Sequence, residues 1–321
     1  MAKTRYAPDR GLIARMGLTM FLLGVVFVAF VLALYLVLSA SGRGGAGVVF
    51  FPIVLALGLG FGSFYWSDKI ALRTAGAVEV TPQQAPELHG IVDRICALTD
   101  MPKPRVAIAQ SRMPNAFATG RSSKKAVICV TSSLMEKLDE RELEGVLAHE
   151  MSHVAHKDVA VMTIASFIGI VAALLVRFAF YSELFGGGGG GRGRGGGGNN
   201  NNGGGLPVVL VVMVVGIVVY AISFLLIRLL SRYRELSADR SGALLTGQPS
   251  ALASALQKVT GEMARIPTKD LRAAEPLNAF YFAPAFARGG AGASLSALFS
   301  THPSLERRLK ELAKISDQLS R

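Results

Sequence analysis

Residues 149–153 are His-Glu-Met-Ser-His, which supply the groups that a metal-dependent hydrolase needs. Two histidines four positions apart on a helix project from the same face, because side chains at i and i+4 stack one above the other. Their imidazoles can take two corners of a zinc tetrahedron, and Glu150 can reach the zinc-bound water as general base. The pentapeptide therefore predicts a zinc metalloprotease with His149 and His153 as ligands.

A catalytic zinc needs a third protein ligand. His156 is on nearly the same helical face, but three ligands from one straight helix would be spread over about 10 Å and cannot converge. Glu235 is the stronger candidate, because it directly follows the last apolar segment, at the same predicted membrane face as the histidines. Asp239 shares its helix face and is expected to accept the ring N–H of a ligating histidine. The alternative for Glu235 is an interface carboxylate paired with Arg232 or Arg234.

The elements that must position these residues are largely apolar. The chain of 321 residues is 51% hydrophobic and only 17% charged, with a mean hydropathy of +0.42, which is too apolar for a soluble protein of this size. The first apolar run is longer than a signal peptide and is interpreted as an anchor. Runs of bilayer-spanning length lie at about 16–38, 47–66, 159–181 and 206–230.

The net charge of +12 is attributed to basic residues in the cytoplasmic segments of a membrane protein. The positive-inside rule places both termini and the 67–158 segment in the cytoplasm, next to the bilayer. No interleaving of aromatic and basic residues suggests nucleic-acid binding. A transporter or channel is disfavoured, because none of the four runs has an interior Asp, Glu, Lys or His.

The cytoplasmic parts are predicted to be mainly helical. A helix is expected to end near Thr99, followed by a small antiparallel sheet of strands at 105–110, 113–120 and 126–131. Asp139 with Glu142 has the pattern of a capping box at the start of the histidine-bearing helix. Two more helices are predicted over Pro249–Arg265 and Pro303–Leu319. The fold class is an α-helical membrane protein with about four transmembrane helices and a zincin-like cytoplasmic protease domain.

Four regions follow along the chain. Residues 1–66 form an N-terminal tail and transmembrane hairpin, and 159–230 form a second hairpin. Its loop, 186–205, is almost pure Gly and Asn, with nothing to bury, and is expected to be disordered. Residues 67–158 and 231–321 form the two cytoplasmic protease parts.

Two further candidate sites rest on weaker signals. Asn115, Ala116 and Phe117 fit an edge strand beside the active-site helix, where an extended substrate is held by strand addition. The alternative is a turn Asn ahead of a core Phe117. His302 is a candidate catalytic donor to the oxyanion of the tetrahedral intermediate. Its alternative is the N-cap of the last helix.

Four segments together resemble the HtpX-type membrane metalloproteases, relatives of the CAAX prenyl proteases: 141–153 (RELEGVLAHEMSH), 231–239 (SRYRELSAD), 114–120 (PNAFATG) and 300–308 (STHPSLERR). The resemblance implies an integral-membrane, zinc-dependent endopeptidase with a cytoplasmic active site that cleaves misfolded or damaged membrane proteins. It places the zinc ligands at His149, His153 and Glu235, one Zn²⁺ per chain, and the base at Glu150. It also supports the 115–117 segment as part of the cleft.

The predicted partners are unfolded or damaged membrane proteins and the lipid bilayer, with no nucleic acid. The predicted location is the inner (plasma) membrane, in a multi-pass topology. A CAAX-type prenyl-peptide protease is the alternative enzyme, although that family usually has more than four spans. A non-catalytic zinc-binding scaffold of the same fold is the other alternative. The sequence gives no oligomeric state.

Overall fold

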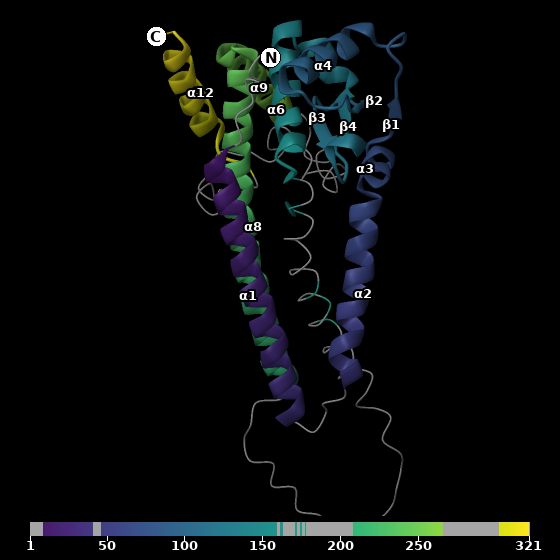
Figure 1. The fold of residues 1–321 in the computed structure, drawn as a ribbon, viewed down its shortest axis with the longest axis vertical. Coiled ribbons are helices and arrows are strands. Elements are labelled where there is room, and N and C mark those ends of the chain that lie inside the picture. Colours follow the sequence, from purple (N-terminus) through teal and green to yellow (C-terminus); the bar gives the residue numbers. More distant parts are fainter. Residues whose placement is uncertain are drawn as a thin grey trace, which may run out of the picture. The chain divides into compact units, whose positions relative to one another are not determined.

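The computed structural model describes residues 9–40, 46–158, 161–162, 171, 174, 177, 208–265 and 302–320. The chain divides into two compact units (Figure 1). The first unit comprises residues 1–16, 63–162 and 228–321, and the second comprises 17–62 and 163–227. Every candidate site residue belongs to the first unit.

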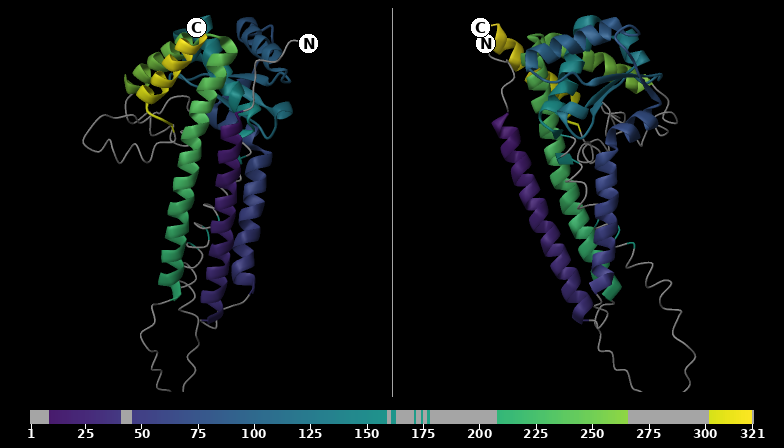
Figure 2. Two further views of the ribbon diagram at one scale, coloured as in Figure 1. Left: turned by 60° about the vertical axis from the view of Figure 1, so that its left-hand side comes forward. Right: turned by 45° about the vertical axis from the view of Figure 1, so that its right-hand side comes forward.

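Three long helices carry most of the apolar sequence: α1 (Arg10–Ala40), α2 (Ala46–Tyr65) and α8 (Val208–Thr246). Among the described residues, Arg10–Ala33 and Met213–Thr246 are long and apolar enough to cross a membrane. Figure 2 shows α8 as one continuous helix. Its 39 residues span about 58 Å, nearly twice the thickness of a bilayer's hydrocarbon core. The helix is therefore long enough to carry ligands beyond a membrane-spanning stretch.

The four predicted spans correspond to these helices only in part. The runs at 16–38 and 47–66 fall largely in α1 and α2, and 206–230 falls largely in α8. The run at 159–181 is described at only five positions, and the Gly- and Asn-rich loop 186–205 lies outside the described residues. Two candidate membrane helices are therefore present, and four crossings stay a prediction.

A small mixed sheet forms the centre of the first unit. Its strands are β1 (Ala77–Glu79), β2 (Arg105–Ala109), β3 (Ala116–Thr119) and β4 (Val127–Thr131), in the order β1-β2-β4-β3. β2 and β4 are parallel, whereas β1–β2 and β3–β4 are antiparallel. The prediction of an antiparallel sheet is wrong, because alternation shows that a strand is half-buried but not which strand it pairs with. β4, buried along its whole length, is the inner strand between β2 and β3.

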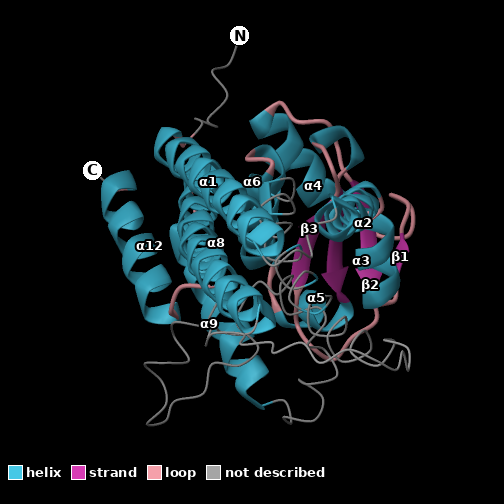
Figure 3. Cartoon of the chain, turned by 90° about the horizontal axis from the view of Figure 1, so that it is seen from below, coloured by secondary structure: helices cyan, strands magenta, loops and turns pink. Residues whose placement is uncertain are grey.

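Helices cover both faces of this sheet (Figure 3). On one face, alternate residues of β3 and β4 pack against α4 (Pro86–Thr99) and α6 (Glu140–Ala155). On the other face, α3 (Ser67–Ala75) packs through Ala71 and Leu72 against Phe117, Val127 and Cys129. Within the described residues, the remaining elements are the short helices η1 (Ser123–Lys125) and α5 (Ser132–Lys137), then α9 (Pro249–Arg265) and α12 (Leu305–Leu319).

The start of α6 is fixed by the predicted capping box. The Asp139 side chain accepts a hydrogen bond from the Glu142 backbone N–H, and the Glu142 side chain accepts one from the Asp139 N–H. Glu142 is buried and also accepts from Ser254 Oγ at 2.6 Å and Lys258 Nζ at 2.7 Å, both on α9. One carboxylate therefore orients the histidine-bearing helix and ties it to α9.

Replacing Glu142 with Ala is expected to destabilise this unit, because it removes the cap contact and both side-chain contacts with α9, from the partly buried Ser254 and from Lys258. The unfolding temperature of the full chain in detergent should fall by about 4–8 °C. Glu140→Ala is the matched control, since Glu140 is an exposed carboxylate of the same helical turn, paired with Arg94. That control should shift the temperature by less than about 2 °C. Equal shifts for the two variants would contradict the role given to Glu142.

Candidate metal centre

Helix α6 delivers two histidines to one buried point. The His149 and His153 rings meet edge to face with centroids 4.9 Å apart, and their Nε2 atoms are separated by 3.2 Å. This is the geometry expected for i and i+4 positions on one helical face. Both side chains are buried.

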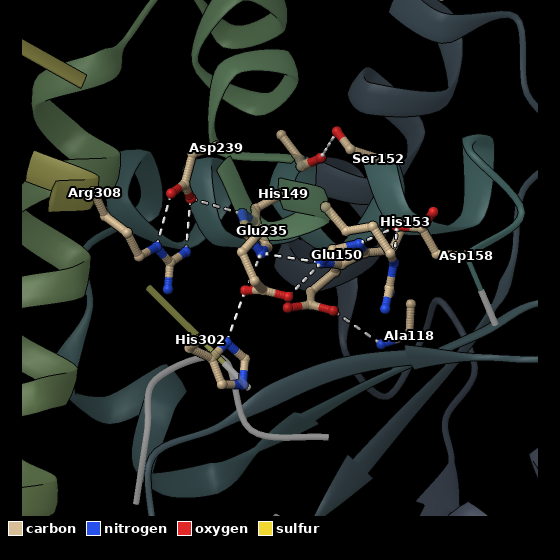
Figure 4. A network of polar contacts seen from close by, with 12 residues as sticks. Ala118, His149, Glu150, Ser152, His153, Asp158, Glu235, Asp239, His302 and Arg308 are labelled. Atoms are coloured by element: carbon tan, nitrogen blue, oxygen red, sulfur yellow. Dashed lines mark hydrogen bonds and ion pairs between the residues drawn. The ribbon is translucent and has the colours of Figure 1, made fainter. Parts of the chain in front are cut away.

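Glu235 of α8 brings a carboxylate to the same point (Figure 4). Its Oε2 lies 3.6 Å from His149 Nε2, and its Oε1 lies 3.5 Å from His153 Nε2. The possible ligand atoms of these three residues all lie within 4.8 Å of one another. In a tetrahedral zinc site with bonds of 2.0–2.1 Å, neighbouring ligand atoms are about 3.3 Å apart. The spacing therefore fits a zinc ion.

The far side of each histidine ring faces an aspartate. His149 Nδ1 is 2.9 Å from Asp239 Oδ1, and His153 Nδ1 donates a hydrogen bond to Asp158 Oδ2 at 2.6 Å. A proton held at each Nδ1 leaves a lone pair on each neutral Nε2. Two lone pairs and the Glu235 carboxylate then converge, an arrangement that favours a cation at this point.

The electrostatic field at this point favours positive charge. Burial alone would lower the pKa of His149, but Asp239 and Glu235 raise it to about 9. Carboxylates that favour a proton on an imidazole also favour a metal ion in its place. The donor set of two imidazoles and one carboxylate is one that zinc prefers.

Both aspartates are themselves paired with arginines. Arg308 of α12 donates two hydrogen bonds to Asp239, from Nε to Oδ2 at 2.7 Å and from Nη2 to Oδ1 at 2.6 Å. Arg234 Nε lies 2.9 Å from Asp158 Oδ2. Burial would raise the pKa of Asp158, but Arg234 and His153 bring it below its ordinary value. Each histidine is therefore held by an aspartate whose charge an arginine balances.

The carboxylates and guanidiniums of the site do not cancel one another. Four carboxylates face two guanidiniums, and the excess of two negative charges favours protons on the buried histidines or a divalent cation in their place. The carboxylates belong to Glu150, Asp158, Glu235 and Asp239, and the guanidiniums to Arg234 and Arg308; all but Arg234 are less than 9% exposed, and the Arg234 side chain is 11% exposed.

Glu150 lies beside the proposed ligands, as Figure 4 shows. Its Oε2 accepts a hydrogen bond from the backbone N–H of Ala118 on β3, at 3.1 Å. Burial raises the pKa of Glu150, against the opposing effects of the two histidines and the Ala118 N–H. A carboxylate whose pKa is raised in this way is better suited to accept and return a proton near neutral pH.

His302 lies beside the third proposed ligand. Its Nδ1 is 2.8 Å from Glu235 Oε2, and the residue is buried. The alternative that His302 caps the last helix is wrong, because Ser304 is the N-cap of α12 and accepts from the Arg307 N–H. His156, at the end of α6, is half-buried and is not part of the three-residue cluster.

The segment 115–117 lies at the start of β3, whose next residue, Ala118, contacts Glu150 through its backbone N–H. Asn115 pairs with Thr131 of β4 through both its N–H and its carbonyl. Ala116 and Ala118 face the α6 side of the sheet, and the buried Phe117 side chain packs against α3. The alternative of a core Phe117 therefore describes its side chain correctly. β3 is an edge strand of the sheet.

Four residues that shape the site were not predicted from the sequence. Asp158 approaches His153 because Lys157 adopts a left-handed conformation, φ 59°, just after α6 ends. Arg234 and Arg308 were hidden among the many basic residues of their helices. Gly242 of α8 lies so close to α6 that a Cβ there would be 3.0 Å from the His149 backbone nitrogen. None of these contacts leaves a spacing pattern in the sequence.

Known proteins share this chain's sequence over nearly its full length. The model of "Peptidase family M48" matches residues 82–316. The chain belongs to peptidase family M48. The Protease HtpX homolog 1 of Streptomyces coelicolor is 54% identical over 318 residues, covering 99% of this chain and 97% of its own. The Protease HtpX homolog 2 of Methanosarcina mazei is 47% identical over 319 residues, covering 99% of this chain and all of its own.

These matches confirm the predicted resemblance to the HtpX-type metalloproteases and favour it over the CAAX-type alternative. A crystal structure of S. mikatae Ste24p aligns with a TM-score of 0.49 at 15% identity, over 95% of this chain and 66% of that chain. As a member of family M48, the chain is a metalloprotease by family.

Arg308→Gln is expected to lower zinc affinity about 10- to 100-fold, because Asp239 loses the partner that fixes its contact with His149. Zinc dissociation would be measured by competition with a chromogenic chelator. Arg307→Gln is the matched control, because Arg307 precedes Arg308 on α12 and is exposed. An Arg308→Gln protein that folds and binds zinc as tightly as the wild type would contradict the role of Arg308 in positioning Asp239.

Gly242→Ala should also weaken zinc binding, because its methyl group would displace the backbone of His149. The same chelator competition measures the effect, and a loss of about tenfold or more is expected. Gly261→Ala on α9 is the control, since a Cβ there meets nothing within 4 Å. If both alanines behave alike, the close approach of α8 to α6 is not what sets the ligand position.

Proposed function

We propose that this chain is an integral-membrane, zinc-dependent endopeptidase that cleaves misfolded or damaged membrane proteins on the cytoplasmic side of the plasma membrane. The observation that carries the proposal is the convergence of His149, His153 and Glu235 on one point with Glu150 beside it. Membership of family M48 and the HtpX relatives support the proteolytic activity. The candidate membrane helices in α1 and α8 support the membrane location.

His149, His153 and Glu235 would hold one zinc ion. When bound there, zinc polarises a peptide carbonyl and makes water nucleophilic at neutral pH. Asp239 and Asp158 keep a proton on each Nδ1, so that both Nε2 atoms present lone pairs. Arg308 and Arg234 hold the two aspartates in place, which limits the freedom of the ligands.

Glu150 acts as the general base in this proposal. Its carboxylate takes a proton from the attacking water and then delivers it to the nitrogen of the leaving amine. The Ala118 N–H fixes one carboxylate oxygen, Oε2, and leaves Oε1 for the proton transfer. Burial of Glu150 keeps competing water away from this step.

His302 has one of two roles, depending on its protonation. Because Nδ1 faces a carboxylate, that nitrogen carries the proton, and a neutral ring has no second N–H to offer an oxyanion. As an imidazolium, His302 donates from Nε2 to the oxyanion of the tetrahedral intermediate. As a neutral ring, it orients Glu235 toward the metal.

The substrate is proposed to bind as an added strand along β3. Thr131 occupies the backbone groups of Asn115 that face β4, and in an antiparallel pair the groups of neighbouring residues alternate sides. Ala116 and Ala118 therefore direct their backbone groups toward the free edge, where Ala118 N–H meets Glu150. Strand addition here would place a peptide alongside the base and would suit unfolded chains of varied sequence.

Glu150→Gln is expected to bind zinc like the wild type and to lose peptide hydrolysis by at least about 10²-fold, because the amide cannot accept the proton. The protein would be purified in detergent, and bound zinc and cleavage of unfolded casein measured together. Glu144→Gln, on the same helix and paired with Arg94, is the control that should keep both. About one zinc per chain without hydrolysis in the wild type would favour a scaffold, and absence of zinc would overturn the proposal.

A further inference from the structure

An exposed aromatic pair lies where helix α2 ends. Tyr65 and Trp66 are 46% and 51% exposed, and their rings meet edge to face with centroids 5.7 Å apart. α2 contains no charged residue over its 20 positions, and the chain becomes polar directly after it. Aromatic residues at such a boundary are typical of the membrane–water interface.

Cations gather around the same aromatic pair. The Arg121 guanidinium lies over the Tyr65 ring, 4.0 Å from its centroid. The charges of Lys69 and Lys125 also act on the Tyr65 hydroxyl, and both lysines are exposed. The Tyr65 hydroxyl also accepts a hydrogen bond from the Arg121 side chain.

These cations have no acidic partner of their own among the residues that the structure describes. Asp68, which precedes Lys69 in the chain, and Glu79 are both paired with Arg105. Lys69, Arg121 and Lys125 form no ion pair with any described carboxylate, so the six residues together keep a net charge of +2. All of these residues belong to the first unit.

We propose that Tyr65, Trp66, Lys69, Arg121 and Lys125 form a binding surface for the headgroup phosphate of an anionic phospholipid. The partner must be anionic at the lysines and apolar beside the aromatic rings. An anionic phospholipid next to an apolar helix meets both conditions at once, whereas a nucleic acid or an acidic peptide meets only the first. Ile70, which is 51% exposed on the following helix, extends the apolar side of the surface.

This surface adjoins β3, the strand along which the substrate is proposed to bind. Arg121 follows β3 after Gly120, where the φ of +126° disfavours a side chain and a Cβ would lie 2.5 Å from the Lys125 carbonyl oxygen. α3, which carries Lys69, packs beneath Phe117 of β3. A headgroup bound here fixes one end of β3 at the bilayer surface. If the proposed function holds, the segments presented for cleavage are those next to the bilayer.

The single tryptophan of the chain, Trp66, makes the surface directly measurable. The full chain would be reconstituted in bilayers of phosphatidylcholine containing brominated phosphatidylglycerol, and in the reverse mixture with brominated phosphatidylcholine. Bromine quenches tryptophan fluorescence at short range, so the signal reports which lipid lies beside Trp66. The readout needs no proteolytic activity, and its result is independent of the proposed function.

In the wild type, the quenching of Trp66 by brominated phosphatidylglycerol should correspond to a local fraction of this lipid about fivefold or more above its mole fraction in the bilayer. Lys69→Gln, Arg121→Gln and Lys125→Gln together should abolish the enrichment, and single substitutions should reduce it stepwise. Exchanging Lys for Arg and Arg for Lys at the three positions should retain it. The matched control neutralises Arg307, Lys310 and Lys314 on the exposed face of α12 and should behave like the wild type.

Quenching in proportion to mole fraction in the wild type would overturn the proposal. So would an α12 control that lost the enrichment as completely as the surface variants, since net charge alone would then explain the effect. Retained enrichment in all three single variants and in the triple variant would also contradict the assignment of these residues.

Discussion

The metal centre is organised around an excess of buried negative charge. Four carboxylates and two guanidiniums lie close together in a place from which water is largely excluded. Unbalanced charges are costly in such surroundings, so this arrangement is stable only with a further positive charge. Two imidazole nitrogens and a carboxylate define where that charge must lie, because all three direct lone pairs at one point. The arginines then balance the aspartates that would otherwise draw the proton from each imidazole.

The site is assembled from segments that are far apart in sequence. α6 provides two of the proposed ligands and the proposed base, α8 provides the third proposed ligand, and the C-terminal segment provides His302 and Arg308. A shared apolar core that includes residues of α6, α8, α9 and α12 holds these helices in register. The C-terminal segment contributes two buried polar groups, so it is part of the site and not an appendage. Its contacts reach the ligands Glu235 and, through Asp239, His149.

The sequence predicts those parts of the site that follow helical periodicity. His149 and His153, the position of Glu235 relative to Asp239, and the Asp139–Glu142 capping box all depend on spacings within one helix, and the structure shows each of these contacts. It does not predict contacts between elements, such as Arg308 with Asp239, because no local pattern records them. The prediction of the sheet was wrong for the same reason. Three of the four strands were located and β1 was missed, and the parallel pairing of β2 with β4 depends on the path of the chain between them. Asp158 was missed because a left-handed turn at Lys157, uncommon for a residue with a side chain, brings it back toward α6.

Small side chains on β3 determine how closely this strand approaches Glu150. Ala116 and Ala118 face the α6 side of the sheet and are buried there. A larger residue at either position would push the strand away from α6, and the 3.1 Å hydrogen bond from Ala118 N–H to Glu150 would be lost. The same N–H that fixes the carboxylate belongs to the edge at which a peptide would add. The sheet edge and Glu150 are therefore directly connected, and a peptide added at this edge, as proposed, would be positioned relative to Glu150 by backbone geometry, whatever its side chains.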